Sequence, residues 1–169
     1  EILAELDFHL NEIFNNEKND SEAKQGVIKI LYQEGSNTFK LLSEKAEEYF
    51  VSLKDLHSTI IFALLKKFDF GYVILTFGVG DCPINLINED FSEVQLLNIM
   101  DVGEFGGGTR FITMNEIFDD SIFSRIRITL AKDFSKLVLM TDGLYDPKFI
   151  TENKLEDIES WKTFFDDLN

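Results

Sequence analysis

The sequence predicts an α+β domain in which helices flank an antiparallel sheet. Three observations carry this prediction: a helical N-terminal third, a middle section of short apolar runs, and an amphipathic tail. The connections between the apolar runs have hairpin length, which favours antiparallel pairing. We expect residues 1–55 to be helical, 56–146 to be mainly strands, and 150–168 to form a C-terminal helix, within one domain spanning 1–169.

The N-terminal third carries apolar residues at helical spacing. A first helix includes Leu6 and Leu10 and ends at the polar run 15–20. Ser21 is suited to cap a second helix, which we expect to break at residues 35–37 before a third helix follows.

The middle section, which begins near His57, contains the expected strands. Its last part includes a run with period-two alternation, typical of a half-buried strand. Residues 109–113 are either a strand or an extended loop. The expected strands cover residues 58–65, 72–80, 84–87, 94–97, 125–130 and 137–141.

Charge and cysteine usage exclude several classes of protein. With 31 acidic and 16 basic residues the net charge is −15, so the chain repels phosphate backbones and we expect no nucleic-acid partner. The lone Cys82 allows no intrachain disulfide and fits a reducing, cytoplasmic setting. No apolar run reaches about 18 residues, so we expect no membrane partner. The chain opens at Glu1 inside an amphipathic pattern, so we expect an upstream sequence.

The apolar run 137–141 ends in a Thr and leads directly into Asp142-Gly143, with a second carboxylate at Asp146. A carboxylate held at the end of a buried strand is well placed to bind a hard metal ion or to transfer a proton. Taken alone, the pattern is equally typical of an ordinary Asp-Gly turn that leaves a core strand.

Other motifs indicate chemistry more weakly. The run 78–81 lacks the third glycine and the helix of a dinucleotide fingerprint. The glycines at 106–108 are consistent with a phosphate cradle or with an ordinary loop. Cys82 with His57 as its base is a possible nucleophilic pair, but one Cys and two His give no zinc spacing.

Four segments, taken in order, resemble motifs of the PPM/PP2C family of metal-dependent serine/threonine phosphatases, in its bacterial and phage branch. The resemblance spans roughly residues 55–150, and His57 and Cys82 stand where the family has Gly and Ser. The segments are His57-Ser58-Thr59, Gly78-Val79-Gly80-Asp81-Cys82, the stretch from Gly103-Glu104 to Thr109-Arg110-Phe111, and Leu139-Met140-Thr141-Asp142-Gly143-Leu144-Tyr145-Asp146.

The resemblance implies a PP2C-like antiparallel β-sandwich that hydrolyses phosphoprotein substrates. It implies that Asp142 binds one of two Mg²⁺ or Mn²⁺ ions, whose shared water attacks phosphorus. Asp146 would support this site or a third ion, and Asp101 is a further candidate for that ion. Structural roles around the metal are implied for Asp81, Gly80 and Gly143.

The chain also departs from the family pattern. The family carries an Asp and an Asp-Gly pair on strands before its first helices and a final metal Asp after its last helix. Here Asp142-Gly143 is the only Asp-Gly pair, and the chain stops at Asn169. We therefore expect an incomplete sandwich, truncated at both ends and nearly inactive alone. A missing strand would leave a sheet edge open to self-association.

Two alternatives stay open at the level of sequence. The first is a non-catalytic PP2C-like pseudophosphatase that binds a protein partner. The second is an acidic α+β interaction domain unrelated to phosphatases.

Overall fold

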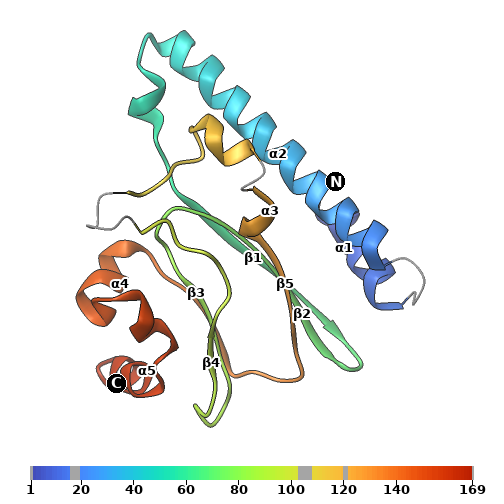
Figure 1. Ribbon diagram of the computed structural model, residues 1–169, viewed down its shortest axis with the longest axis vertical. Helices are drawn as coiled ribbons and strands as arrows, with labels where there is room; N and C mark the ends of the chain where they lie inside the picture. The colour runs from blue at the N-terminus through green and yellow to red at the C-terminus, as the bar shows by residue number, and fades with distance from the viewer. Residues whose placement is uncertain (1, 16–19, 103–107, 120–121, 169) are drawn as a thin grey trace. The chain divides into compact units, whose positions relative to one another are not determined.

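The computed structural model describes residues 2–15, 20–102, 108–119 and 122–168 (Figure 1). Helices come first, strands dominate the middle and helices close the described chain, an α+β order that confirms the predicted class. In order the elements are α1 (Ile2–Asn15), α2 (Asp20–Tyr49), η1 (Leu53–Leu56), β1 (Ile60–Phe68), β2 (Gly71–Val79), β3 (Ile84–Ile87), β4 (Val94–Leu96), η2 (Asn115–Phe118), α3 (Ile122–Arg125), β5 (Ile126–Ala131), β6 (Lys136–Leu139), α4 (Asp142–Phe149), η3 (Glu152–Glu156) and α5 (Ile158–Asp166).

The chain folds as two compact units. A helical unit contains residues 1–58 and 112–123, and a sheet unit contains 59–111 and 124–169. Each is described by itself below. Within the described residues, no helix combines the length and the apolar character that crossing a membrane requires.

In the helical unit α1 and α2 form a hairpin around a small apolar core. The predicted break at residues 35–37 is wrong, because α2 is continuous from Asp20 to Tyr49. The reason is tertiary packing. Phe118 lies so close to Gly35 that a Cβ there would come within 2.8 Å of its ring. The helix thus uses its glycine as a contact point, and packing overrides the low helix propensity of glycine.

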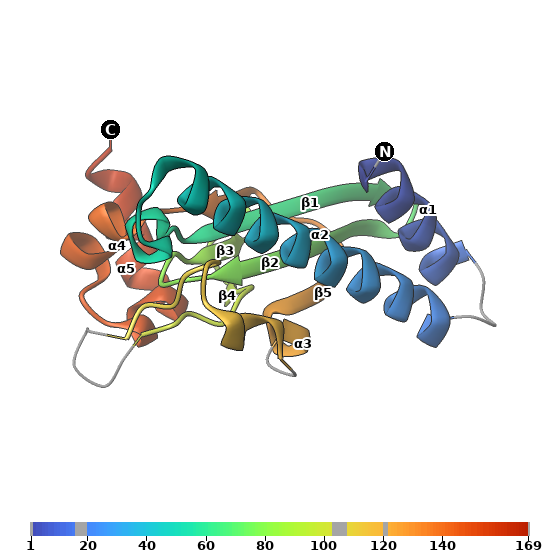
Figure 2. The ribbon, with the colours of Figure 1, turned by 90° about the horizontal axis from the view of Figure 1, so that it is seen from above.

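The sheet unit contains two three-stranded antiparallel sheets, with strand orders β1-β2-β5 and β4-β3-β6 (Figure 2). We call them the first and the second sheet. β1 extends to Phe68, three residues beyond the prediction, and joins β2 through only Asp69 and Phe70. The strand predicted at 125–130 is β5, shifted by one residue. Residues 109–113 contain no strand.

The two sheets pack face to face, which confirms the predicted sandwich. Ile74 of the first sheet meets Ile84 and Leu86 of the second in one buried cluster. Inside this core the Thr76 hydroxyl of β2 donates to the carbonyl of Leu97, the residue after β4, at 2.7 Å. This arrangement fixes the end of β2 relative to β3, and the candidate site lies between those strands in the chain.

The opposite face of the second sheet is covered by the C-terminal helices. Their core contains Tyr145, Phe149 and Trp161 packed with Ile87. The predicted helix 150–168 is divided, with η3 preceding α5, and the Asp157 side chain caps α5 by accepting from the Ser160 amide. This layer carries α4, and with it the predicted metal-binding carboxylates, onto the sandwich (Figure 1).

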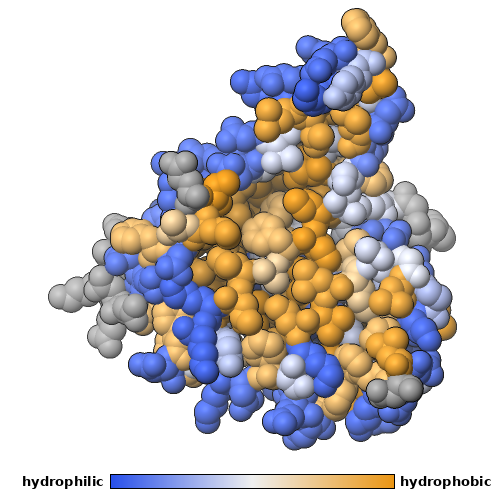
Figure 3. Space-filling view, turned by 180° about the vertical axis from the view of Figure 1, so that it is seen from behind, coloured by the Kyte–Doolittle hydropathy of each residue, from blue (hydrophilic) through white to orange (hydrophobic). Residues whose placement is uncertain are grey.

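β1 is an edge strand of the first sheet, paired with β2 on one side only. Apolar side chains are exposed along this sheet and at the turn between β1 and β2. Figure 3, the view from behind Figure 1, shows how widely apolar residues cover that face. The exposed ones are Ile60, Leu65, Phe70 and Leu130.

Candidate functional site

Asp142 is the first residue of α4, so the Asp-Gly turn that the sequence also allowed is not observed. Tyr145 and Phe149 are buried one helical turn apart, and this apolar pair explains why the segment forms a helix. An aspartate is also favourable in the first turn, where its charge meets the positive end of the helix dipole. One Asp142 oxygen accepts from the Gly143 amide at 2.8 Å.

The two carboxylates of α4 are accessible. Asp142 and Asp146 are both exposed, and their spacing of four residues places them on the same side of the helix. Both therefore present hard oxygen atoms to solvent, as a Mg²⁺ or Mn²⁺ ligand must.

The turn after β2 meets the start of α4. Gly80 has φ +114°, a conformation that disfavours other residues, and Thr59 packs where a Cβ would stand. Two residues later, the buried Cys82 thiol lies near the Asp142 amide and the Thr59 hydroxyl. The next residue, Pro83, accepts at its carbonyl from the Met140 amide at 3.2 Å. Burial raises the pKa of the Cys82 thiol, and the hydrogen-bonding effects of the Asp142 amide and Thr59 only partly oppose this. The segments 78–82 and 139–146 thus come together.

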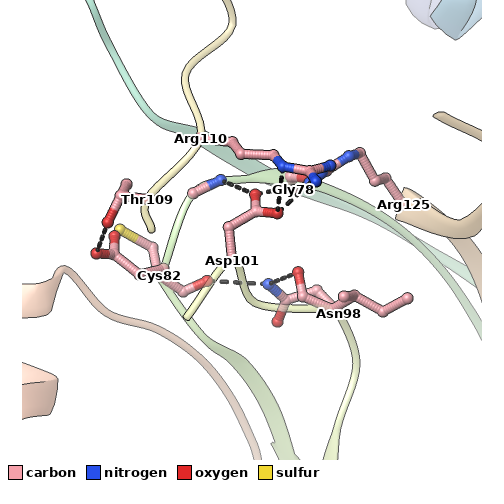
Figure 4. Close-up of polar contacts among 10 residues, drawn as sticks. Gly78, Cys82, Asn98, Asp101, Thr109, Arg110 and Arg125 are labelled. Carbon is pink, nitrogen blue, oxygen red and sulfur yellow. Dashed lines mark hydrogen bonds and ion pairs between the residues drawn. The ribbon is translucent and has the colours of Figure 1, made fainter. Parts of the chain in front are cut away.

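Asp81 joins a third segment to this site. The Thr109 hydroxyl donates to an Asp81 oxygen at 2.7 Å (Figure 4). Burial raises the pKa of Tyr145, and the nearby charges of Glu152, Asp146 and Asp81 raise it further. All four motif segments, the first of them through Thr59, therefore meet in one region of the sheet unit.

A buried ion pair lies beside this turn. Both Asp101 oxygens accept from Arg125, at 2.7 and 2.8 Å, and one also accepts from the Gly80 amide at 2.8 Å (Figure 4). The Arg110 guanidinium lies 3.9 Å from the same carboxylate. The prediction that Asp101 binds a third ion stays untested, but the partners observed here are cationic side chains and an amide.

Sequence reasoning did not identify this pairing. The expected strand over residues 125–130 included Arg125, whereas Arg125 ends α3 and is only 4% exposed. The period-two alternation of 125–130 hides the change from helix to strand at this residue. An arginine next to apolar residues is the only signal in the sequence, and it does not reveal the partner.

The described residues fit a metal centre only in part. Asp142 and Asp146 have suitable chemistry and exposure, yet among the described residues no group of three or more His, Cys, Asp or Glu side chains lies close enough to hold an ion. By themselves these two carboxylates do not complete a metal centre.

The other candidate sites from the sequence, the Cys–His pair and the glycine run, receive less support from the structure. His57 Nδ1 lies 2.5 Å from the Thr113 hydroxyl in the helical unit, whereas the partners seen for Cys82 are Thr59 and the Asp142 amide. The predicted phosphate cradle at 106–108 falls mostly outside the described residues, as do Gly103 and Glu104 of the third motif.

In the comparison with known protein families, a family model described as protein phosphatase 2C matches residues 4–169. Neither the curated proteins nor the solved structures contain a match to the chain.

Proposed function

The chain belongs to the protein phosphatase 2C family, and from that premise we propose that it forms part of a metal-dependent domain that hydrolyses phosphoserine and phosphothreonine esters in proteins. The observation that carries the proposal lies just beyond the paired ends of β3 and β6, where the Pro83 carbonyl accepts from the Met140 amide at 3.2 Å and the Cys82 thiol lies near the Asp142 amide. It brings two ordered family motifs together, although they lie far apart in the chain.

Asp142 is the metal ligand in this proposal, and Asp146 supports it. Two bound ions would lower the pKa of a bridging water and neutralise the phosphoryl oxygens. The contribution of this chain is to hold carboxylate oxygens in solvent at the start of a helix. The buried core of Tyr145, Phe149 and Trp161 keeps that helix in place.

We propose that these 169 residues alone turn over phosphate esters slowly or not at all. A two-metal centre needs several ligands, and the described residues provide no group of three. The same observation favours a second candidate, a PP2C-like domain that binds a protein partner without catalysis. The two candidates differ in whether Asp142 binds Mn²⁺.

A phosphatase assay with p-nitrophenyl phosphate and Mn²⁺ tests the proposal. Three chains are compared: wild type, Asp142→Asn, and Asp133→Asn, which alters an exposed carboxylate in the β5–β6 connection. We expect hydrolysis near background in all three, with Mn²⁺ bound by wild type and Asp133→Asn only. Robust hydrolysis lost in Asp142→Asn would overturn the claim of an incomplete centre. Absence of Mn²⁺ binding would favour the non-catalytic domain.

We also propose that two copies pair through the free edge of β1. Antiparallel pairing centred on Leu64 would place Lys66 opposite Phe62 and Lys67 opposite Ile61, so that no two lysines face each other. Light scattering after size exclusion should give a mass that rises with concentration, and Leu65→Lys should abolish the rise. A monomer at all concentrations would contradict this proposal.

A further inference from the structure

We propose that the Asp101–Arg125 ion pair is a positioning device, which holds the Gly80–Cys82 turn against the first residue of α4. The importance of that residue, Asp142, rests on the proposed function. The inference itself rests on contacts that lead from Arg125 through Asp101 to the turn that contains Cys82 (Figure 4).

The ion pair is buried and its geometry is fixed. The side chains of Arg125 and Asp101 are 4% and 8% exposed. Two parallel hydrogen bonds, from Nη1 and Nη2, engage the two carboxylate oxygens at 2.7 and 2.8 Å. A bidentate pair of this kind permits one relative orientation of its partners, because a rotation of either group breaks a bond.

The pair holds the backbone at the end of β2. Gly80 donates its amide to Asp101 Oδ2 at 2.8 Å, and its carbonyl accepts from the Asp101 amide at 2.9 Å. Arg125 Nη1 also donates to the Gly78 carbonyl at 3.3 Å. Both polar backbone groups of Gly80 are therefore hydrogen-bonded to Asp101. Arg125 binds the carbonyl of Gly78, which lies two residues earlier in the chain.

The turn transmits this placement to α4. Gly80 is followed directly by Asp81, which Thr109 binds, and by Cys82, whose thiol lies near the Asp142 amide. The next carbonyl, that of Pro83, accepts from the Met140 amide at 3.2 Å, two residues before Asp142. A displacement of Gly80 would move Cys82 and Pro83 and weaken both contacts. The position of the Asp142 backbone thus depends on a residue pair that does not touch it.

Stability alone does not explain why two charges are buried here. A buried ion pair often contributes no more than apolar side chains of similar size. The described structure even leaves Arg125 Nε buried without a hydrogen-bond partner. The pair nevertheless satisfies Gly80 completely, which fits a role in placing the turn.

Hydrogen exchange measured residue by residue tests the inference. The variants are Asp101→Asn, Arg125→Lys and the control Val73→Ala, which destabilises β2 near its other end. In Asp101→Asn the Gly80 and Asp142 amides should exchange about ten- to hundredfold faster, while Trp161 keeps its protection. Arg125→Lys retains the positive charge but cannot form the two parallel hydrogen bonds of a guanidinium, so it should give a smaller acceleration at the same amides. It also keeps the test available if Asp101→Asn does not fold.

The pattern of exchange decides the outcome. Acceleration confined to Gly80 and Asp142, and absent in Val73→Ala, would support a positioning role. A uniform acceleration that includes Trp161, or unchanged exchange at Asp142, would overturn it. Mn²⁺ broadening of the Gly143 amide, recorded on the same samples, tests the proposed function separately. Its absence in wild type would count against metal binding and would leave the exchange result unaffected.

Discussion

The carbonyl of Leu155 accepts two buried hydrogen bonds, and this predicts strong coupling between two residues of the C-terminal layer. Trp161 Nε1 and Asn85 Nδ2 each donate to it at 2.8 Å, and all three residues are fully buried. Removing either donor leaves the carbonyl with the other. Removing both leaves a buried acceptor with neither, so the double variant should lose more stability than the single variants together.

The expected magnitudes follow from these contacts. Trp161→Phe loses one hydrogen bond and part of a buried ring, about 2 kcal/mol together. Asn85→Ala loses one strong bond but also removes Asn85 Oδ1, a buried atom without a partner in the described structure, so its net cost is about 1 kcal/mol. The unsatisfied carbonyl in the double variant adds about 1–3 kcal/mol beyond the sum.

Urea unfolding followed by far-UV circular dichroism measures this coupling. Fluorescence is unsuitable, because Trp161 is the only tryptophan. An interaction term of about 1 kcal/mol or more is expected, whereas additivity within about 0.5 kcal/mol would refute the shared-acceptor argument.

Three further predictions concern the turn, the last helix and the thiol. Gly80→Ala should cost about 2 kcal/mol or more in urea unfolding, because of its positive φ and the packing of Thr59. Its control Gly143→Ala, with 3.9 Å to the nearest atom, should be neutral or stabilising by up to about 1 kcal/mol. Hydrogen bonds from Ser160, and then Lys154, hold the pKa of Asp157 below its ordinary 3.8. The ionised Asp157 side chain therefore contributes to stability above pH 3.8, and this contribution is lost as the pH falls from 3.8 through the lowered pKa. The difference in unfolding free energy between wild type and Asp157→Ala should therefore close on acidification. If this difference in unfolding free energy were the same at pH 7 and below the lowered pKa, the assigned role of the Asp157 carboxylate would be refuted. Cys82, at 6% exposure and with a raised pKa, should react slowly with a thiol reagent until urea unfolds the chain, and fast labelling of the native chain would contradict its burial.

Much of the fold could be predicted because local patterns and tertiary structure agree in the strands. The runs around Ile74, Ile84 and Leu137 carry the apolar residues that the sandwich buries, and hairpin-length links indicate antiparallel pairing. The prediction was wrong where packing outweighs local preference. Gly35 remains helical because Phe118 packs against it, and Asp142-Gly143 begins a helix because Tyr145 and Phe149 are buried behind it.

The site could be predicted less completely, because its contacts join residues far apart in the chain. The order of the motifs indicated that the segments around Asp81 and Asp142 belong together, and the Cys82 contact places them side by side. The pairing of Asp101 with Arg125 spans 24 residues and has no local signature. Burial and partner choice of this kind depend on how α3 leads into β5, which periodicity does not reveal.

The most direct test of the account is a Mn²⁺ titration followed by amide line broadening in wild type, Asp142→Asn and Asp133→Asn. If Asp142 is a metal ligand, broadening begins at Asp142 and Gly143, persists in Asp133→Asn and disappears in Asp142→Asn. Broadening that persists unchanged in Asp142→Asn, or that spreads evenly over the acidic surface, would contradict the assignment of this residue as a ligand of the phosphatase metal centre.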